Sequence, residues 1–378
     1  MPSGRHREKW GRTAVFRLPG GGKKLRFDPT FHERPVICHI NLASDYAGGE
    51  RQTELLIGAL SARGWQQRLV VRNKHALVRR CADIPNLDIV QVSSNLVAAG
   101  LAAHGSALVH AHEARCVYSA LLASMLFGTP YVLTRRVVRP QNKSWIRDRS
   151  FWRASAVVAV SNAVARHIQV ANPGLECKVV PDAHAHFEAD ANESHSIRHD
   201  RKDKILIGHI GTLAHSAKGQ LTIIKTAHKA ATSRPDWHFL LLGSGDDEAL
   251  FRREIAGLEN IELIGFVDNV GDYLASFDLF VFPSLHEALG STLLDAMHFG
   301  LPIVASDIGG IPEVVENGVN GLLIEPGSAD QLFDGIAAIV DDRALAEAMR
   351  DANVAKAAGF STDRMADAYE KVYRNILG

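Results

Sequence analysis

The chain has 378 residues, which is too long for one ordinary α/β core and predicts two domains. Apolar residues make up 46% of the chain and charged residues 22%, the balance of an ordinary globular protein. The 42 Lys and Arg residues match the 42 Asp and Glu residues. The chain as a whole therefore has no field that would recruit nucleic acid, and an anionic partner would have to bind local patches.

The cysteines and the hydropathy predict a cytoplasmic protein. No Cys-x-x-Cys pair is present, which argues against a zinc site or a disulfide framework and fits a reducing compartment. No apolar run approaches the ~20 residues that span a bilayer, and no apolar signal segment follows the first ten residues. Peripheral contact with the cytoplasmic face of the inner membrane stays open as an alternative. The cysteines are Cys38, Cys81, Cys116 and Cys177.

Residues 1–34 differ in composition from the rest of the chain. They hold nine Lys or Arg residues against Glu8, Asp28 and Glu33, and a run of three glycines breaks any periodic pattern. We predict a disordered basic tail. It is either a plain solvated extension, which includes a start site placed too early, or a segment weakly attracted to anionic lipid head groups.

Residues 35–190 read as a first Rossmann-like domain. Short apolar runs without polar alternation are separated by amphipathic stretches, which is typical of a parallel sheet covered by helices on both faces. The expected strands are 36–42, 68–71, 87–92, 107–110, 131–134 and 156–160, and the expected helices are 50–63, 116–127 and 162–170.

A polar segment at 182–204 then interrupts the alternation. It contains four histidines, but they lie among small and polar residues with no evident supporting partners, so a linker between domains is favoured over a metal site. The histidines are His184, His186, His195 and His199.

Residues 203–360 repeat the α/β pattern as a second Rossmann-like domain, and residues 361–378 read as a C-terminal helix that packs back on the first domain. The fold class predicted is α/β, with two doubly wound parallel sheets facing a cleft at their carboxyl ends, where ligands bind in open α/β sheets. The expected strands are 205–210, 238–242, 261–264, 279–282, 302–305 and 321–324, and the expected helices are 221–233, 248–257, 291–299, 329–340, 344–358 and 362–377.

The stretch 283–306 carries the strongest chemical signal. A strand ends at its start, a loop brings Glu287, and a helix begins near Gly290 and Ser291 with Asp295 in its early turns. Free N–H groups at a helix start favour an anion, and glycine lets a ligand approach the backbone closely. The two carboxylates suit vicinal hydroxyls. A phosphate flanked by two polyol-binding carboxylates describes a nucleotide sugar.

The spacing of Glu287, seven residues and Asp295 resembles the Glu-x7-Glu signature of the family-4 retaining glycosyltransferases, which have the GT-B fold. By that likeness Glu287 contacts the transferred sugar and Asp295 the ribose hydroxyls of the donor. The backbone of Gly290, Ser291 and Thr292 would face sugar and phosphate. Further matches are Asp278, Pro283, Ser284, Ala296, Met297, Gly300, Pro302, Gly309, Gly310, Pro312, Glu313 and Gly321.

A second match lies at the first turn of the second domain, in the stretch 211–219. Lys218 corresponds to the family's Lys on the donor pyrophosphate, whereas the usual Arg position is Thr212. One charge-assisted contact is worth ~1.5–3 kcal/mol, so the missing Arg is a substantial departure. His209 or His215 could replace that cation. Phe266, in the stretch 265–267, resembles the segment whose backbone reads the base.

The first domain offers two weaker matches. Gly48 and Gly49 resemble the family's diglycine turn, whose backbone approaches the diphosphate from the opposite wall. His112, in the pattern His110-Ala-His112, resembles the family's cleft histidine near the donor sugar, and His110 reads as structural.

An Arg-rich stretch follows the strand expected at 131–134. Arg135, Arg136 and Arg139 are the acceptor-binding candidates, either for an anionic acceptor such as a phosphorylated saccharide or glycolipid, or as a merely solvated loop. The combined pattern resembles bacterial enzymes of lipopolysaccharide core or surface-polysaccharide assembly.

The resemblance implies retaining transfer of a sugar from a nucleoside diphosphate sugar to an acceptor hydroxyl, with His112 and Glu287 at the reacting centre. It implies no cofactor and no metal, because helix N-termini and Lys218 would carry the diphosphate charge. Two alternatives stay open. One is a non-catalytic GT-B relative that binds sugar nucleotide, and the other is a different GT-B enzyme such as a nucleotide-sugar epimerase.

Overall fold

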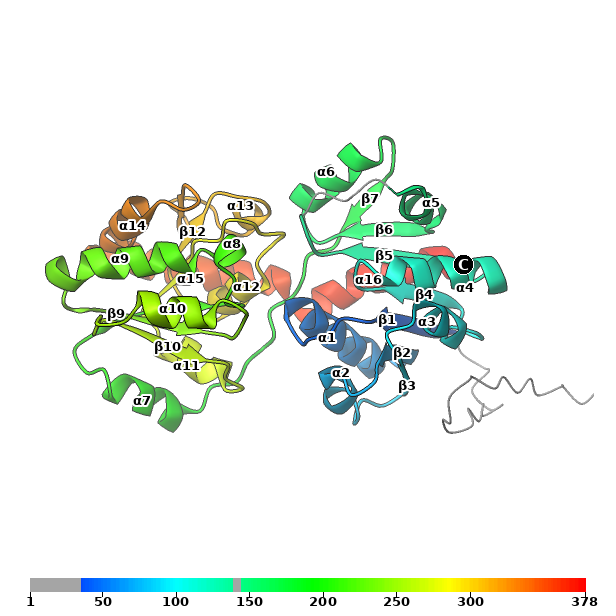
Figure 1. Cartoon of the computed structure of the whole chain (residues 1–378), viewed down its shortest axis with the longest axis horizontal. Helices are drawn as coiled ribbons and strands as arrows, with labels where there is room; N and C mark the ends of the chain where they lie inside the picture. Colours follow the sequence, from blue (N-terminus) through cyan, green and yellow to red (C-terminus); the bar gives the residue numbers. More distant parts are fainter. Residues whose placement is uncertain (1–34, 139–143) are drawn as a thin grey trace, which may run out of the picture.

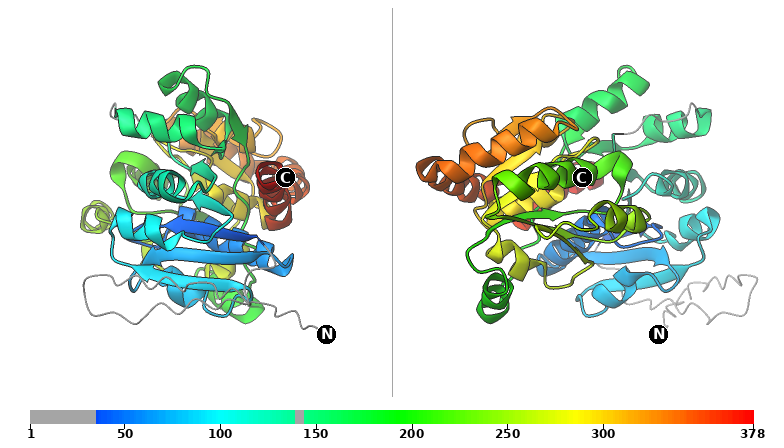
Figure 2. Two further views of the ribbon diagram at one scale, coloured as in Figure 1. Left: turned by 90° about the vertical axis from the view of Figure 1, so that its right-hand side faces the viewer. Right: turned by 60° about the vertical axis from the view of Figure 1, so that its left-hand side comes forward.

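The computed structural model describes residues 35–138 and 144–378, so the predictions for residues 1–34 and for Arg139 lie outside the described residues. Two α/β domains stand side by side, and each has a parallel sheet with helices on both faces (Figures 1 and 2). The predicted fold class is confirmed.

The N-terminal sheet has seven parallel strands in the order β3-β2-β1-β4-β5-β6-β7. Every residue of β4 and β6 is buried, which explains why these strands show no polar alternation. The strands are β1 Val36–Asn41, β2 Gln66–Arg72, β3 Leu87–Val92, β4 Leu108–Ala111, β5 Tyr131–Arg135, β6 Ala156–Ala159 and β7 Cys177–Val179. The helices are α1 Gly48–Ala62, α2 Ala76–Arg80, α3 Leu96–Ala102, α4 Cys116–Phe127, α5 Trp145–Arg153 and α6 Asn162–Ala171.

The C-terminal sheet has six parallel strands in the order β10-β9-β8-β11-β12-β13. All six were expected from the sequence. They are β8 Ile205–Ile210, β9 Trp237–Leu242, β10 Ile261–Gly265, β11 Leu279–Phe282, β12 Ile303–Ser306 and β13 Leu322–Ile324. The helices are α7 Ala191–His199, α8 His215–Lys218, α9 Gln220–Ser233, α10 Glu248–Glu254, α11 Val270–Ser276, α12 Ser291–His298, α13 Ile311–Val314, α14 Ala329–Asp341 and α15 Arg343–Ala357.

The polar segment 182–204 is more than a loop between the domains. Asp190 caps α7 by accepting hydrogen bonds from two backbone N–H groups of its first turn. The backbone N–H of Asp190 also donates to the Asp272 carboxylate at 2.7 Å, which fixes α7 against α11 of the C-terminal domain. The linker proper is therefore the part of this segment that precedes Asp190.

The chain crosses between the domains twice, and the second crossing returns it to the N-terminal domain. After the short 3-10 helix Ala358–Phe360, α16 (Thr362–Leu377) lies against the N-terminal domain (Figure 1). Met365, Tyr369 and Tyr373 of α16 are buried in one apolar cluster with residues of β1, β4 and α1. This packing ties the C-terminal helix to the first domain.

In addition to the two chain crossings, hydrogen bonds join the domains directly. Ser161 Oγ donates to the Ala288 carbonyl at 2.6 Å. The Glu313 carboxylate accepts from the backbone N–H groups of Asn162 and Ala163, each at 2.8 Å, at the N-terminus of α6. A carboxylate is favourable there because the first N–H groups of a helix lack intrahelical partners. No helix in residues 35–138 and 144–378 is long and apolar enough to cross a membrane.

Candidate active site between the two sheets

The carboxyl ends of both sheets face the junction of the domains, and two helix N-termini meet there. A Cβ added at Gly48, the first residue of α1, would lie 3.1 Å from Ser291 Oγ, the first side chain of α12. Helix starts from the two domains therefore approach one another across the junction. Their N–H groups favour a negatively charged group between them.

The start of α12 depends on a glycine. Gly290 has φ of 91° and ψ of 68°, a left-handed conformation that L side chains rarely adopt. Gly290 is the N-cap and has no side chain that could bond the first-turn N–H groups. The Leu293 N–H donates to the Gly290 carbonyl at 2.9 Å, which leaves the N–H groups of the half-buried Ser291 and Thr292 for a ligand.

Lys218 and Glu287 form the central ion pair of the C-terminal side. Lys218 Nζ lies 2.6 Å from Glu287 Oε2. The other oxygen, Oε1, accepts from the Ala288 backbone N–H at 3.1 Å. Lys218 ends α8 and Glu287 lies in the loop after β11, so the two strands β8 and β11 bring together groups 69 positions apart. This is the point where the strand order reverses, the usual place for a ligand in an open α/β sheet.

Asp295 is held by partners from outside its own domain. Its Oδ1 accepts from the Ala185 backbone N–H at 2.7 Å, and its Oδ2 lies 3.5 Å from Arg51 of α1. The side chain is almost fully buried, and this burial raises the pKa of the carboxyl to about 6, although Arg51 and the Ala185 N–H oppose the shift. In this arrangement Asp295 joins α12, the linker and α1.

The arginine that is missing at position 212 is not replaced by His209. His209 is fully buried, and its Nδ1 lies 3.0 Å from the Val281 carbonyl. Burial lowers its pKa to about 4, so His209 is neutral near pH 7. His215 is paired with Asp247 at 2.8 Å. The Thr212 carbonyl accepts from Gln220. The expectation that one of these histidines replaces the cation is therefore wrong for His209, and His215 is committed to another carboxylate.

His112 follows β4 and presents one unpaired nitrogen. Gln67 Nε2 donates to the Ile57 carbonyl, so Gln67 Oε1 faces His39 and accepts from its Nε2 at 3.0 Å. His39 Nδ1 is then the acceptor for His112 Nε2, at 2.9 Å. His112 Nδ1 is left as a buried acceptor without a partner in the described residues.

Burial and the neighbouring charges fix the charge state of His112. Its pKa lies well below the ordinary value because burial is combined with repulsion from His110, His39 and Arg136. A neutral imidazole with a free acceptor nitrogen suits a ligand hydroxyl. His110 instead bonds Tyr373 OH and Thr134 Oγ1, each at 2.6 Å, and so holds α16 on the sheet.

Of the two described candidates for acceptor binding, Arg135 is buried and Arg136 is half-buried, with 9% of its side chain exposed. Arg136 Nε pairs with Asp182 at 3.0 Å, and Arg136 Nη1 donates to the His112 carbonyl at 3.3 Å. Arg136 Nη2 and Arg135 Nε have no partner among residues 35–138 and 144–378. Burial lowers the pKa of Arg135 to about 10, with Arg147 adding repulsion. The solvated-loop alternative is therefore wrong for these two arginines.

Phe266 follows the end of β10 and exposes 64% of its surface, which is unusual for an aromatic side chain. The glycine before it, Gly265, has φ of 91°. Phe266 thus lies at the carboxyl edge of the C-terminal sheet, the same edge as Lys218 and Glu287.

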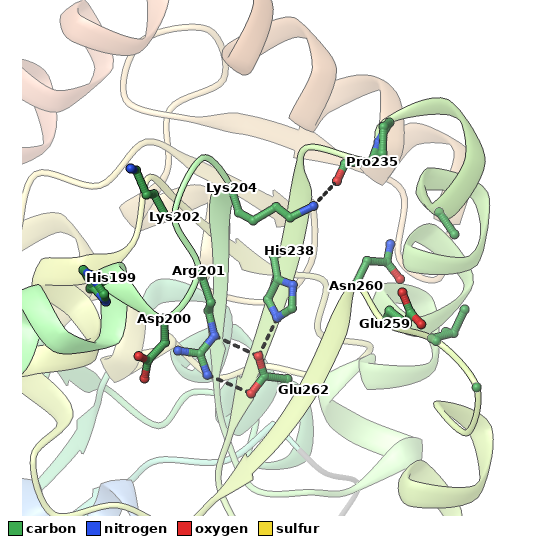
Figure 3. Close-up of a pocket in the computed structure, with 13 residues that line it drawn as sticks. His199, Asp200, Arg201, Lys202, Lys204, Pro235, His238, Glu259, Asn260 and Glu262 are labelled. Carbon is green, nitrogen blue, oxygen red and sulfur yellow. Dashed lines mark hydrogen bonds and ion pairs between the residues drawn. The ribbon is translucent and has the colours of Figure 1, made fainter.

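A separate hollow lies at the opposite, amino end of the C-terminal sheet (Figure 3). Its floor is a closed set of partners: Arg201 pairs with the Glu262 carboxylate at 2.7 Å, and His238 Nε2 lies 2.6 Å from the same carboxylate. The charged groups of this floor are thus paired with one another. The hollow lies at the wrong end of the strands for the nucleotide of an α/β sheet.

Several residues of the site had no recognisable signal in the sequence. His39, Gln67 and Asp182 lie in ordinary strand or linker stretches, and the bonds His39–His112, His39–Gln67 and Arg136–Asp182 span 73, 28 and 46 positions. Arg51 follows the diglycine, and its proximity to Asp295, 244 positions away, is fixed only by the two domains together. An alternation of apolar and polar residues carries no information on such contacts.

Comparison with known proteins agrees with this geometry. Residues 204–342 match the family model described as glycosyl transferases group 1. The chain is 27% identical over 304 residues to an alpha-maltose-1-phosphate synthase of Mycobacterium tuberculosis, covering 69% of this chain and 76% of that protein. It is 29% identical over 242 residues to the lipopolysaccharide core biosynthesis mannosyltransferase LpsB of Rhizobium meliloti, covering 60% and 67%.

Solved structures resemble the whole two-domain arrangement. The crystal structure of Anabaena HepE in complex with UDP-glucose aligns with a TM-score of 0.80 at 20% identity, covering 90% of this chain and 99% of that one. Sucrose-phosphate synthase from Thermosynechococcus elongatus aligns with a TM-score of 0.76 at 18% identity, covering 91% and 99%.

Fold, site and relatives together define the class of protein as a two-domain glycosyltransferase of the GT-B fold. Residues 204–342 match the glycosyl transferases group 1 model, and the chain is a glycosyltransferase enzyme.

Proposed function

We propose that this enzyme moves a sugar, with retained anomeric configuration, from a nucleoside diphosphate sugar to a hydroxyl of a saccharide or glycolipid acceptor. The observation that carries the proposal is the meeting of the N-termini of α1 and α12 beside the Lys218–Glu287 pair. Two helix starts and a lysine form a site for a diphosphate, and the adjacent carboxylate faces the sugar that the diphosphate carries.

In this proposal the donor separates Lys218 from Glu287 and gives each of them a new partner. The diphosphate takes Lys218 and the N–H groups of Ser291 and Thr292, and Glu287 is released to accept hydrogen bonds from hydroxyls of the sugar. Gly48 and Gly49 close on the diphosphate from the N-terminal domain. His112 Nδ1 accepts a hydroxyl of the same sugar. The exposed face of Phe266 lies where the base would bind.

The proposed transfer uses no metal and no cofactor. Stabilisation of the leaving diphosphate would come from Lys218 and from two helix N-termini, which are fixed before the reaction and need no reorganisation. Arg51 would replace the cation that is missing at position 212, because it already reaches α12 through Asp295. Asp295 would turn from Arg51 to the ribose hydroxyls when the donor enters.

The proposed acceptor side is formed by Arg135, Arg136 and Arg139, and lipopolysaccharide core or surface-polysaccharide assembly is the proposed setting. The LpsB relative supports this setting. Arg135 Nε and Arg136 Nη2 are buried nitrogens without a partner in the described residues, and they support an anionic acceptor, such as a phosphorylated sugar. A bacterial acceptor of that kind would bring the enzyme to the cytoplasmic face of the inner membrane.

The proposal is tested by a donor screen in EDTA. Purified protein is offered UDP-, GDP- and ADP-sugars, and thermal shift, slow donor hydrolysis and transfer to phosphorylated saccharide acceptors are followed. One donor should stabilise the wild type and be hydrolysed, and Glu287→Ala should abolish the hydrolysis. NMR of the product should show the donor's anomeric configuration. Binding without turnover on any acceptor, or an epimerised free sugar nucleotide, would overturn the proposal.

A further inference from the structure

Three histidines outside the donor site gather where the linker meets α12. His184 and His186 belong to the linker, and His298 is the last residue of α12. One ring nitrogen from each histidine lies within 4.8 Å of the corresponding nitrogens of the other two. The rings of His184 and His298 stack with centroids 4.2 Å apart, and those of His184 and His186 lie 4.0 Å apart.

We infer that His184, His186 and His298 form a binding site for a divalent transition-metal ion of the zinc type at the hinge between the domains. Imidazole is a preferred ligand for zinc, copper, nickel and cobalt. Three histidines leave a fourth position of a tetrahedral ion for water. The sequence alone favoured a plain linker for His184 and His186 because they lie among small and polar residues with no evident supporting partners, and the third histidine lies more than 100 positions away.

A second observation points to a ligand. His184 exposes only 2% of its surface, yet its Nδ1 has no hydrogen-bond partner among the described residues. A buried polar atom without a partner is costly, and coordination of an ion would satisfy it. His186 and His298 are exposed, so their rings can turn until the nitrogens reach the ~3.3 Å separation that follows from ~2.0–2.1 Å bonds in a tetrahedral site.

The backbone around the cluster explains why these rings meet. The Ala185 N–H donates to Asp295, one turn before His298 on α12, at 2.7 Å. The His184 N–H donates to the Phe360 carbonyl at 3.0 Å, so this linker segment also touches the second crossing. His186 has φ of 48°, which turns the chain so that both linker histidines lie on the α12 side. An ion bound here would fasten both crossings to α12 and restrain domain opening.

The buried trio of His39, His110 and His112 was weighed as a rival site. Both ring nitrogens of His39 and of His110 already have partners within the protein. An ion there would have to break at least two buried hydrogen bonds, one at His39 and one at His110, whereas at the linker trio it would give the unpaired Nδ1 of His184 a partner.

The test uses the full chain, stripped with EDTA and titrated with Co²⁺ and then with Zn²⁺, without any donor. We expect one Co²⁺ per chain with a tetrahedral visible absorption that Zn²⁺ displaces, and a rise in Tm of roughly 5 °C at about 100 times Kd. His298→Ala and His186→Ala should each weaken the affinity by about tenfold or more and remove the visible band.

His195→Ala is the matched control, because His195 is an exposed histidine on the neighbouring α7 and leaves the trio intact. Its affinity should equal that of the wild type. Equal affinity of wild type, His186→Ala and His298→Ala would overturn the site, as would loss of binding in His195→Ala. Circular dichroism and Tm in EDTA separate loss of ligand from misfolding, since both exposed histidines should be replaceable without loss of fold.

Discussion

Lys218 Nζ lies 2.6 Å from Glu287 Oε2, so the cation expected to hold the diphosphate and the carboxylate expected to hold the sugar neutralise each other before the donor arrives. The pair is partly buried, with side-chain exposures of 25% and 11%. A donor that carries both a diphosphate and hydroxyl groups offers each member a new partner. A free nucleotide offers one only to the lysine.

Replacement of each member of this pair should therefore have a different result. Lys218→Met removes a charge-assisted contact worth ~1.5–3 kcal/mol, and should lower kcat/KM for the sugar donor roughly 10- to 150-fold and weaken nucleoside diphosphate binding to the same degree. Glu287→Gln should abolish most transfer but leave nucleoside diphosphate affinity equal or tighter, because Lys218 no longer has a competing anion. Calorimetry with the nucleotide and steady-state kinetics measure the two effects.

Lys229→Met is the control for charge removal, since Lys229 is an exposed lysine of α9 that pairs with Asp330 of α14. It should leave both quantities unchanged. Parallel loss of nucleotide binding in Glu287→Gln and Lys218→Met would contradict the division of roles.

The two histidines that flank Ala111 should separate activity from stability. His110→Ala leaves Tyr373 and Thr134 without their buried partner, and should lower the free energy of unfolding by about 1–3 kcal/mol for each group left unsatisfied. His112→Ala removes the free acceptor Nδ1, and should lower kcat/KM with a smaller effect on stability. Urea unfolding and steady-state kinetics on both variants test the contrast. An equal loss of stability in both would show that His112 acts through packing.

Most of the architecture could be predicted from the sequence, but the hydrogen-bond partners of several site residues could not. All six strands of the C-terminal sheet follow from apolar runs, and α12 follows from the Gly290 start signal. β7 was missed because it has three residues, none of them fully buried, so no apolar run marks it. α5 and α7 were missed because their sequences are strongly polar.

The polar contacts of the site could not be predicted, because they depend on how the two domains are placed relative to one another. Asp295 is bonded by Ala185 and Arg51, 110 and 244 positions away. The family likeness gave Asp295 a chemical role, but nothing in its neighbourhood revealed those partners. His39 was missed for the same reason, since a buried histidine in a strand shows no partner in the sequence.

Burial of Asp295 should make stability depend on pH in a defined window. Its pKa is about 6 in the folded chain against an ordinary 3.8, so between pH 4 and 6 the folded state keeps a proton that the unfolded state has lost. The free energy of unfolding contributed by this group therefore falls as pH rises through the window. Asp295→Asn cannot ionise, so its stability relative to wild type should rise by up to about 3 kcal/mol from pH 4 to pH 7.

Urea unfolding of wild type and Asp295→Asn at both pH values measures that difference. The same relative stability at pH 4 and pH 7 would mean that the carboxylate is ionised at little cost, with Arg51 compensating for its burial. Arg51→Gln should then restore the pH dependence, because the opposing charge is gone.

The approach of the two helix starts should set how closely the domains can meet around the donor. A Cβ at Gly48 would lie 3.1 Å from Ser291 Oγ, which forces a shift of a few tenths of an ångström, and a larger side chain would separate α1 from α12. We expect Gly48→Val to raise the donor KM severalfold and to lower kcat, because closure completes the diphosphate site.

Gly58→Ala, on the same helix, is the control: its added Cβ meets no atom within 4 Å, so it should leave activity unchanged and raise the free energy of unfolding by roughly 0.5–1 kcal/mol. A double-mutant cycle with Ser291→Ala distinguishes the contact from a general effect: the loss caused by Gly48→Val should be smaller in the Ser291→Ala background, and strictly additive losses would show that the two helix starts do not meet in the working enzyme.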